Sequence, residues 1–180
     1  SAATVRLTQQ TQSVQLAPRI SVLEDTAGTL TLADVQRRAA DFQPSGVGDD
    51  AAINFGYSSS AWWLRIDLAA DPDAARDWLL DVAFPTLDNI EYFGPGGEHR
   101  VAGDRLPFAA RPLLHRNFVF PVRLDESGVG VIWLRVVSEG TLTIPLRLWR
   151  HEAFWQESLT SYAMLAVYFG MLLALAAYNL

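Results

Sequence analysis

The stretch that decides the fold is "NFGYSSSAWWLRIDL", residues 54–68. Its second half places alternate side chains in two different sets, as expected of a β-strand whose two faces meet different surroundings. One set is apolar and predicts a face in a hydrophobic core: Trp62, Leu64, Ile66 and Leu68. The other set places an indole, a guanidinium and a carboxylate together: Trp63, Arg65 and Asp67. This second face is the candidate functional surface of the strand.

A second segment repeats the pattern of tryptophan followed two residues later by arginine. The stretch "VIWLRVVSEG", residues 131–140, contains Trp133 and Arg135, so each pair shares one face of its strand. An indole can stack on the apolar face of a sugar ring, and arginine offers a planar fork to a carboxylate or to vicinal hydroxyls. The pattern therefore indicates a carbohydrate or carboxylate platform.

An alternative interpretation needs no ligand. The arginines would lie outward with their stems on neighbouring tryptophans. They would also pair with carboxylates across strands, and the candidates are Asp67, Asp81 and Glu91.

The rest of the chain up to residue 150 is rich in short apolar runs separated by turn residues. Stretches such as "VQLAPRISVLED", residues 14–25, and "TLTIPLRLW", residues 141–149, predict strands, and "GPGGE", residues 94–98, predicts a turn. Seven to nine such strands indicate an all-β sandwich or barrel. The helix signal in this region is "TLTLADVQRRAADF", residues 29–42, where Thr31 and Asp34 form a capping box.

The C-terminus is of a different kind. Residues 162–180, "YAMLAVYFGMLLALAAYNL", carry no charge, and their number is close to the roughly 20 needed to span a bilayer. The run is apolar all round, which favours a membrane span over a buried or amphipathic helix. We therefore divide the chain into a flexible N-terminus (1–13), a β-sandwich (14–150), a juxtamembrane helix or linker (151–161) and the start of a first transmembrane helix (162–180). The few basic residues before the span favour a position outside the cytoplasm.

Composition excludes several classes of function. The net charge of −6 speaks against a nucleic-acid partner, and the absence of cysteine excludes disulfides and thiolate metal sites. No catalytic motif is present, because Ser58 to Ser60 lack the G-x-S-x-G elbow. A glycoside hydrolase would need two carboxylates near each other, and Asp88 and Glu91 lie on opposite faces of a strand. We expect no cofactor. Calcium binding stays open as an alternative, because acidic side chains in loops can supply oxygen ligands, and the candidates are Asp49-Asp50 and Asp71-Pro72-Asp73.

Six stretches in order carry a family resemblance: "LEDTAGTLTLADV", "NFGYSSSAWWLRIDL", "GDRLPF", "RNFVFPV", "LRVVSEGTLTIPLRLW" and "EAFW". Together they resemble the extracellular sensor domain, second type, of bacterial seven-transmembrane receptors with diverse intracellular signalling modules. The resemblance implies a jelly-roll β-sandwich, similar to carbohydrate-binding modules, in the periplasm and anchored in the inner membrane. It also implies a cytoplasmic output elsewhere in the protein, such as a diguanylate cyclase or a histidine kinase, and no enzyme in this segment.

The resemblance further implies a carbohydrate or another small polar molecule as ligand. Carried over onto this sequence, its candidate site consists of Trp63, Arg65, Arg116, Asn117, Arg135 and Glu139, with Tyr57 and Asp88 as weaker additions. A different hypothesis stays open: the sandwich binds no small ligand and instead forms a homodimer or docks a partner receptor, because exposed tryptophan and arginine are also typical of protein interfaces.

Overall fold

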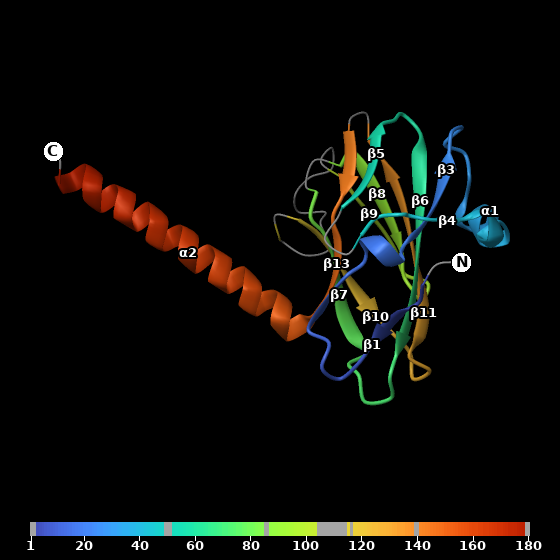
Figure 1. Cartoon of the computed structure of the whole chain (residues 1–180), viewed down its shortest axis with the longest axis horizontal. Coiled ribbons are helices and arrows are strands. Elements are labelled where there is room, and N and C mark those ends of the chain that lie inside the picture. Colours follow the sequence, from blue (N-terminus) through green and yellow to red (C-terminus); the bar gives the residue numbers. More distant parts are fainter. Residues whose placement is uncertain are drawn as a thin grey trace.

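The computed structural model describes residues 3–48, 52–84, 87–103, 115, 117–138 and 141–178. Figure 1 shows two layers of β-strands packed face to face and one long helix, α2, that projects away from them. Among the described residues the sheets contain seven, four and two strands, and none closes into a barrel. The fold is therefore mostly β with a C-terminal helix, as the sequence predicts, while a jelly-roll connectivity stays a prediction.

The large sheet has the strand order β4-β3-β6-β11-β8-β9, with β1 paired to β6. Its central strands are the two that contain the tryptophan and arginine motifs, and they run antiparallel. Its strands are β1 (Val5–Leu7), β3 (Ser21–Asp25), β4 (Gln43–Pro44), β6 (Ala61–Ala70), β8 (Asn89–Phe93), β9 (His99–Ala102) and β11 (Val129–Val137).

The second layer is a four-stranded sheet in the order β10-β7-β13-β2. It consists of β2 (Ser13–Gln15), β7 (Asp77–Val82), β10 (Phe118–Arg123) and β13 (Leu146–Arg150), and a separate pair is formed by β5 (Ile53–Tyr57) and β12 (Thr141–Ile144). The main core lies between the two layers. On β6, Leu64, Ile66 and Leu68 point into this core, and Trp62 packs against it from a half-buried position. The predicted apolar face of residues 62–68 is thus confirmed.

The N-terminus corrects one prediction. Residues 1–13 were expected to be flexible, but Val5–Leu7 form β1, which pairs in parallel with the end of β6. The side chains of Val5 and Leu7 are completely buried, while Arg6 between them is exposed. The alternation of "VRL" was the signal for this strand. The strand has only three residues and polar neighbours on both sides, so its alternation was too short to predict it.

A helical segment covers the outer face of the large sheet. The capping box predicted at Thr31 and Asp34 is present at the start of α1 (Leu32–Arg37), and a short 3₁₀ helix, η2 (Ala39–Asp41), follows. We call residues 26–42 the covering segment. Its apolar side chains form a second hydrophobic cluster with the sheet, made of Val35, Phe42, Trp63 and Trp133, with Leu23, Leu30, Leu32, Ala39, Phe93 and Val131 around them.

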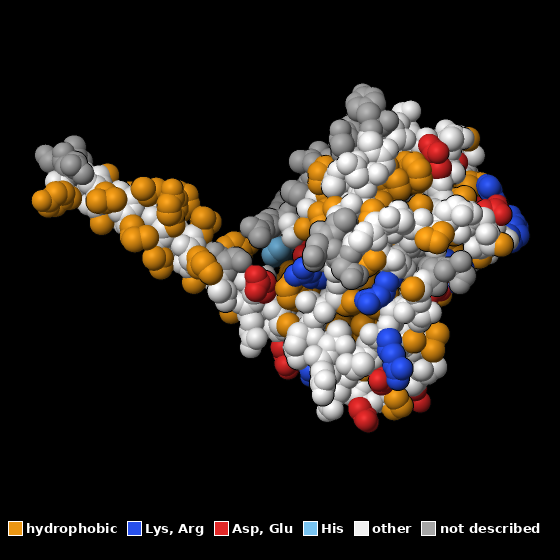
Figure 2. Space-filling view, in the orientation of Figure 1, with side chains coloured by type: hydrophobic (Ala, Val, Ile, Leu, Met, Phe, Trp, Pro, Cys, Tyr) orange, Lys and Arg blue, Asp and Glu red, His pale blue; other side chains and the backbone are white. Residues whose placement is uncertain are grey.

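The C-terminal helix α2 (His151–Tyr178) is continuous. The predicted linker 151–161 and the predicted span from 162 therefore belong to one helix over the described residues. It is long and apolar enough to cross a membrane, and its apolar window has no residue buried. Figure 2 shows hydrophobic side chains along this helix, whereas charged side chains gather on the sandwich. Near its start, Phe154 is buried against Leu79 and Val119 of the small sheet.

One tyrosine links the two layers, and its ionisation makes the free energy of unfolding depend on pH in the alkaline range. Tyr92 of β8 is fully buried, stacks on Phe120 with 5.0 Å between ring centroids, and donates a hydrogen bond of 3.2 Å to the Pro121 carbonyl of β10. Burial, and to a lesser degree the charge of Glu98, raise the pKa of Tyr92 above its ordinary value of 10.0.

We expect this tyrosine to make the free energy of unfolding fall as pH rises above 10.0, because the unfolded chain then ionises Tyr92 and the folded chain does not. Below that pH its contribution is fully present. Urea unfolding at neutral and alkaline pH would measure the slope, and Tyr92→Phe should reduce it. The same slope in both proteins would contradict the assignment.

Candidate functional site

The predicted tryptophan and arginine face is the outer face of the large sheet. The register between β6 and β11 places Trp63 opposite Arg135 and Arg65 opposite Trp133. Each arginine therefore lies beside the tryptophan of the other strand, and the two repeated motifs form a checkerboard. The guanidinium of Arg65 lies over the Trp133 ring, 5.4 Å from its centroid.

Trp63 is not an open stacking surface. Its side chain is 1 % exposed, stacked on Phe93 with 5.8 Å between centroids and enclosed by the covering segment. The expectation of an open indole at this position is therefore corrected. The physical reason is that α1 and Phe42 pack on this face and bury it, a long-range contact that strand periodicity does not reveal. The indole Nε1 is buried and has no hydrogen-bond partner among the described residues.

Arg65 is held in a defined orientation and remains accessible. Its Nε and Nη2 donate hydrogen bonds of 3.1 and 2.8 Å to the same oxygen of Asp67, and 28 % of its side chain is exposed. Among the described residues its Nη1 makes no hydrogen bond. Arg65 lines an open cleft of about 460 Å³ between the sheet and the covering segment, which we call the Arg65 cleft; its walls are Thr4, Ser21, Ala39, Ala40, Phe42, Arg65 and Asp67.

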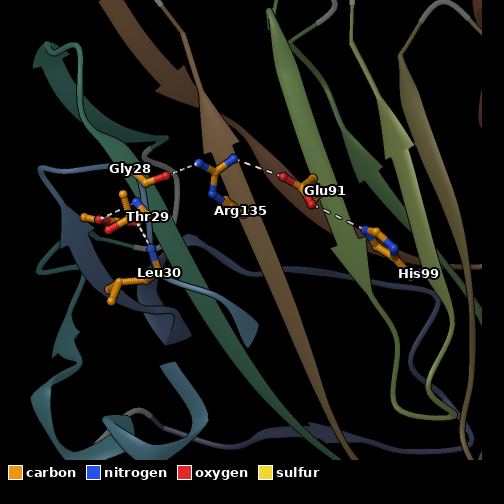
Figure 3. Close-up of polar contacts among 7 residues, drawn as sticks. Gly28, Thr29, Leu30, Glu91, His99 and Arg135 are labelled. Carbon is orange, nitrogen blue, oxygen red and sulfur yellow. Dashed lines mark hydrogen bonds and ion pairs between the residues drawn. The ribbon is translucent and has the colours of Figure 1, made fainter. Parts of the chain in front are cut away.

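Arg135 instead connects parts of the protein to each other. Its Nη1 donates a 3.0 Å hydrogen bond to Glu91, and its Nη2 donates one of 3.0 Å to the Gly28 carbonyl in the covering segment. Glu91 also faces His99 at 3.4 Å, so that one polar chain crosses three strands (Figure 3). With 19 % of its side chain exposed, Arg135 follows the pairing that the ligand-free interpretation predicts.

Asn117 belongs to the other sheet. It directly precedes β10, and its amide donates a 2.9 Å hydrogen bond to Asp81 of β7. Asp88 lies half-buried just before β8 and is not brought next to Arg65 by any described contact. The predicted Arg116 and Glu139 lie outside the described residues, as does the side chain of Tyr57, whose backbone ends β5. Of the predicted residues that the structure describes, Trp63, Arg65 and Arg135 therefore share the outer face of the large sheet, whereas Asn117 lies beside the small sheet.

Metal binding has no support within the described ranges, where no group of three His, Asp or Glu side chains could hold an ion. Asp49 and Asp50 lie outside those ranges, and Asp71 accepts a 3.0 Å hydrogen bond from Arg6. Calcium stays an untested prediction.

Sequence reasoning missed two walls of the Arg65 cleft. Phe42 is the last residue of the helix signal at residues 29–42, and its position there did not show that its ring packs on the sheet against Trp133. Ser21 lies opposite Arg65 in the neighbouring strand β3, and this register could not be known before the strand order. One signal was available: the apolar side of a helix at residues 29–42 has to pack on another surface, and the second face of residues 62–68 is such a surface.

Comparison with known protein families identifies an extracellular receptor domain. A family model described as 7TMR-DISM extracellular 2 matches residues 17–150, which span both layers of the sandwich and end where α2 begins. No curated protein matches the chain.

Proposed function

Since the chain belongs to the 7TMR-DISM extracellular 2 family of seven-transmembrane receptor domains, we propose that it senses a carbohydrate or related small polar ligand at the Arg65 cleft. The domain itself is not catalytic. The family consists of extracellular receptor domains, and α2 is long and apolar enough to anchor this one in the membrane. We therefore propose α2 as the route by which its signal leaves the sandwich.

The accessible and pre-oriented guanidinium of Arg65 is the observation that carries the proposal. Asp67 and Trp133 hold it in place, so little side-chain entropy is lost when a ligand binds. Its remaining donor suits a hydroxyl or a carboxylate. Asp67 can accept from a hydroxyl, and the accessible edge of the largely buried Phe42 gives the cleft an apolar wall. Polar groups that fix orientation beside an apolar wall are typical of small-molecule sites.

The cleft is also suited to transmission. Its walls come from β6 and β3 on one side and from η2 and Phe42 in the covering segment on the other. A ligand that binds one arrangement of these two parts more tightly than the other shifts the receptor towards that arrangement. The output we propose is a cytoplasmic diguanylate cyclase or histidine kinase in the same receptor.

Isothermal titration of the chain against neutral sugars and sugar acids would test the proposal. We expect Arg65→Ala to weaken binding of the best ligand by roughly 10- to 100-fold, because a charge-assisted hydrogen bond is lost. Arg65→Lys should recover only part of the affinity, since an ammonium lacks the planar fork.

Arg123→Ala is the matched control. Arg123 is an exposed arginine that pairs with Asp77 at 2.8 Å and does not line the Arg65 cleft, so its loss should leave the affinity unchanged. If no sugar binds, and light scattering instead shows a dimer that Arg65→Ala dissociates, the domain is an interaction module and the proposal is wrong.

A further inference from the structure

A second cavity lies on the other side of the molecule, between the small sheet and the first turns of α2. It has a volume of about 300 Å³, at the lower end for small-molecule sites. We call it the helix cavity. The sheet and its loops provide Gln15, Asp81, Ala83, His115, Asn117, Pro145, Arg147 and Trp149, and α2 provides Phe154, Glu157, Ser158 and Tyr162.

Opposite charges face this cavity from its two sides. Arg147 of β13 is exposed, and its Nε donates a 3.0 Å hydrogen bond to Gln15, while its guanidinium lies 5.1 Å from the centroid of the Trp149 ring. Glu157 of α2 is exposed as well. Within the described residues, Arg147 and Glu157 form no ion pair with each other or with any other side chain. One cation and one anion therefore remain available in the same cavity, on opposite walls.

Two aromatic side chains, Trp149 and Phe154, form part of the remaining walls. The ring centroids of Trp149 and Phe154 are 6.3 Å apart in an edge-to-face arrangement. The Nε1 of Trp149 is buried without a hydrogen-bond partner among the residues that the structure describes. Because this atom is closed off from the surface, a ligand in the cavity would meet the aromatic rings and not the indole N–H.

From this arrangement we propose that the helix cavity binds a small zwitterion of the amino-acid type. The carboxylate would accept from Arg147, and the ammonium would lie towards Glu157 on the other wall. Asp81 lies opposite Arg147 in the register and accepts a hydrogen bond from Asn117. A phosphate group is disfavoured by the two acids, and a neutral sugar would make no use of the separation between the two charges. The volume admits a small side chain against the aromatic walls.

This inference goes beyond the proposed function, because the site lies on the other sheet from the Arg65 cleft. Its consequence is direct coupling to the membrane. Glu157, Ser158 and Tyr162 belong to the helix whose uncharged part begins directly after Glu157. A ligand that contacts both the small sheet and these residues would favour one packing of α2 on the sandwich.

Titration calorimetry on the full chain in lipid nanodiscs would test the site, with glycine, L-alanine, L-serine and L-proline as probes. L-Alaninamide lacks the carboxylate and N-acetyl-L-alanine lacks the ammonium, so both should bind at least tenfold more weakly than L-alanine. Arg147→Gln and Glu157→Gln should each weaken binding by tenfold or more, as expected for one charged hydrogen bond. Arg123→Gln is the control and should bind as the unaltered chain does.

Three results would overturn the proposal: no probe binds up to millimolar concentration, both cavity variants bind normally, or the two blocked analogues bind as tightly as L-alanine. Tryptophan fluorescence of each variant shows whether it folds. If Arg147→Gln does not fold, Glu157→Gln still tests the cavity, because Glu157 is an exposed side chain of α2 and not part of the sandwich. Arg65→Ala should leave amino-acid binding unchanged, so that failure at this cavity and failure at the Arg65 cleft are told apart.

Discussion

Replacing Trp63 with alanine is expected to lower the free energy of unfolding by about 3–5 kcal/mol, the range for deleting a buried large aromatic side chain. Trp63 is 1 % exposed and lies at the centre of the cluster that joins the covering segment to the sheet. Its removal leaves a cavity beneath α1, and the surrounding side chains, held by the strands, can fill it only partly. Urea unfolding in mild detergent, followed by circular dichroism, measures the change.

Trp63→Phe separates packing from any role of the indole N–H. The phenyl ring keeps most of the buried apolar area and removes a buried donor that has no partner, so we expect a loss of less than about 1.5 kcal/mol. If Trp63→Ala were as stable as the unaltered chain but lost ligand affinity, the covering segment would have to open in solution. Trp63 would then be the stacking surface that the sequence pattern predicts.

Replacing Asp25 with alanine is expected to cost about 2–3 kcal/mol, because two backbone N–H groups lose a charged acceptor. Asp25 ends β3 and is 4 % exposed. Its two carboxylate oxygens accept hydrogen bonds from the backbone of Thr29, at 3.3 Å, and of Leu30, at 2.9 Å. These bonds fix the turn that presents the Gly28 carbonyl to Arg135 (Figure 3).

Asp25→Asn is the matched variant. Its amide oxygen can still accept one of the two bonds, so its loss should lie between the unaltered chain and Asp25→Ala. Hydrogen exchange at the Thr29 and Leu30 amides should accelerate in the same order. Equal exchange in all three proteins would show that the carboxylate does not hold the turn.

The sequence predicts those features that depend on local periodicity. The apolar face of residues 62–68, the capping box of α1 and the helix that begins at residue 151 are all read from spacing within one element. The two tryptophan and arginine motifs also fall on one sheet face, as their alternation requires. Local patterns suffice here because each feature depends on residues that are close in sequence: strand alternation, a capping box and an uninterrupted apolar run.

What lies against each face could not be predicted in the same way. Trp63 and Arg65 have equivalent positions in the strand pattern, yet the covering segment buries the first and leaves the second accessible. Arg135 pairs with Glu91 because β8 lies beside β11, and the strand order alone determines this. The helix cavity depends on how α2 packs on the small sheet, so it cannot be predicted from any single stretch of sequence.

Hydrogen–deuterium exchange of the full chain, with and without the sugar or sugar acid that binds most tightly, tests the central claim most directly. The account predicts slower exchange in the backbone that forms the Arg65 cleft, residues 39–42 and 65–67, and little change at β10 or at the turn between β8 and β9. Unchanged exchange in the cleft, with protection confined to another part of the sandwich, would contradict it.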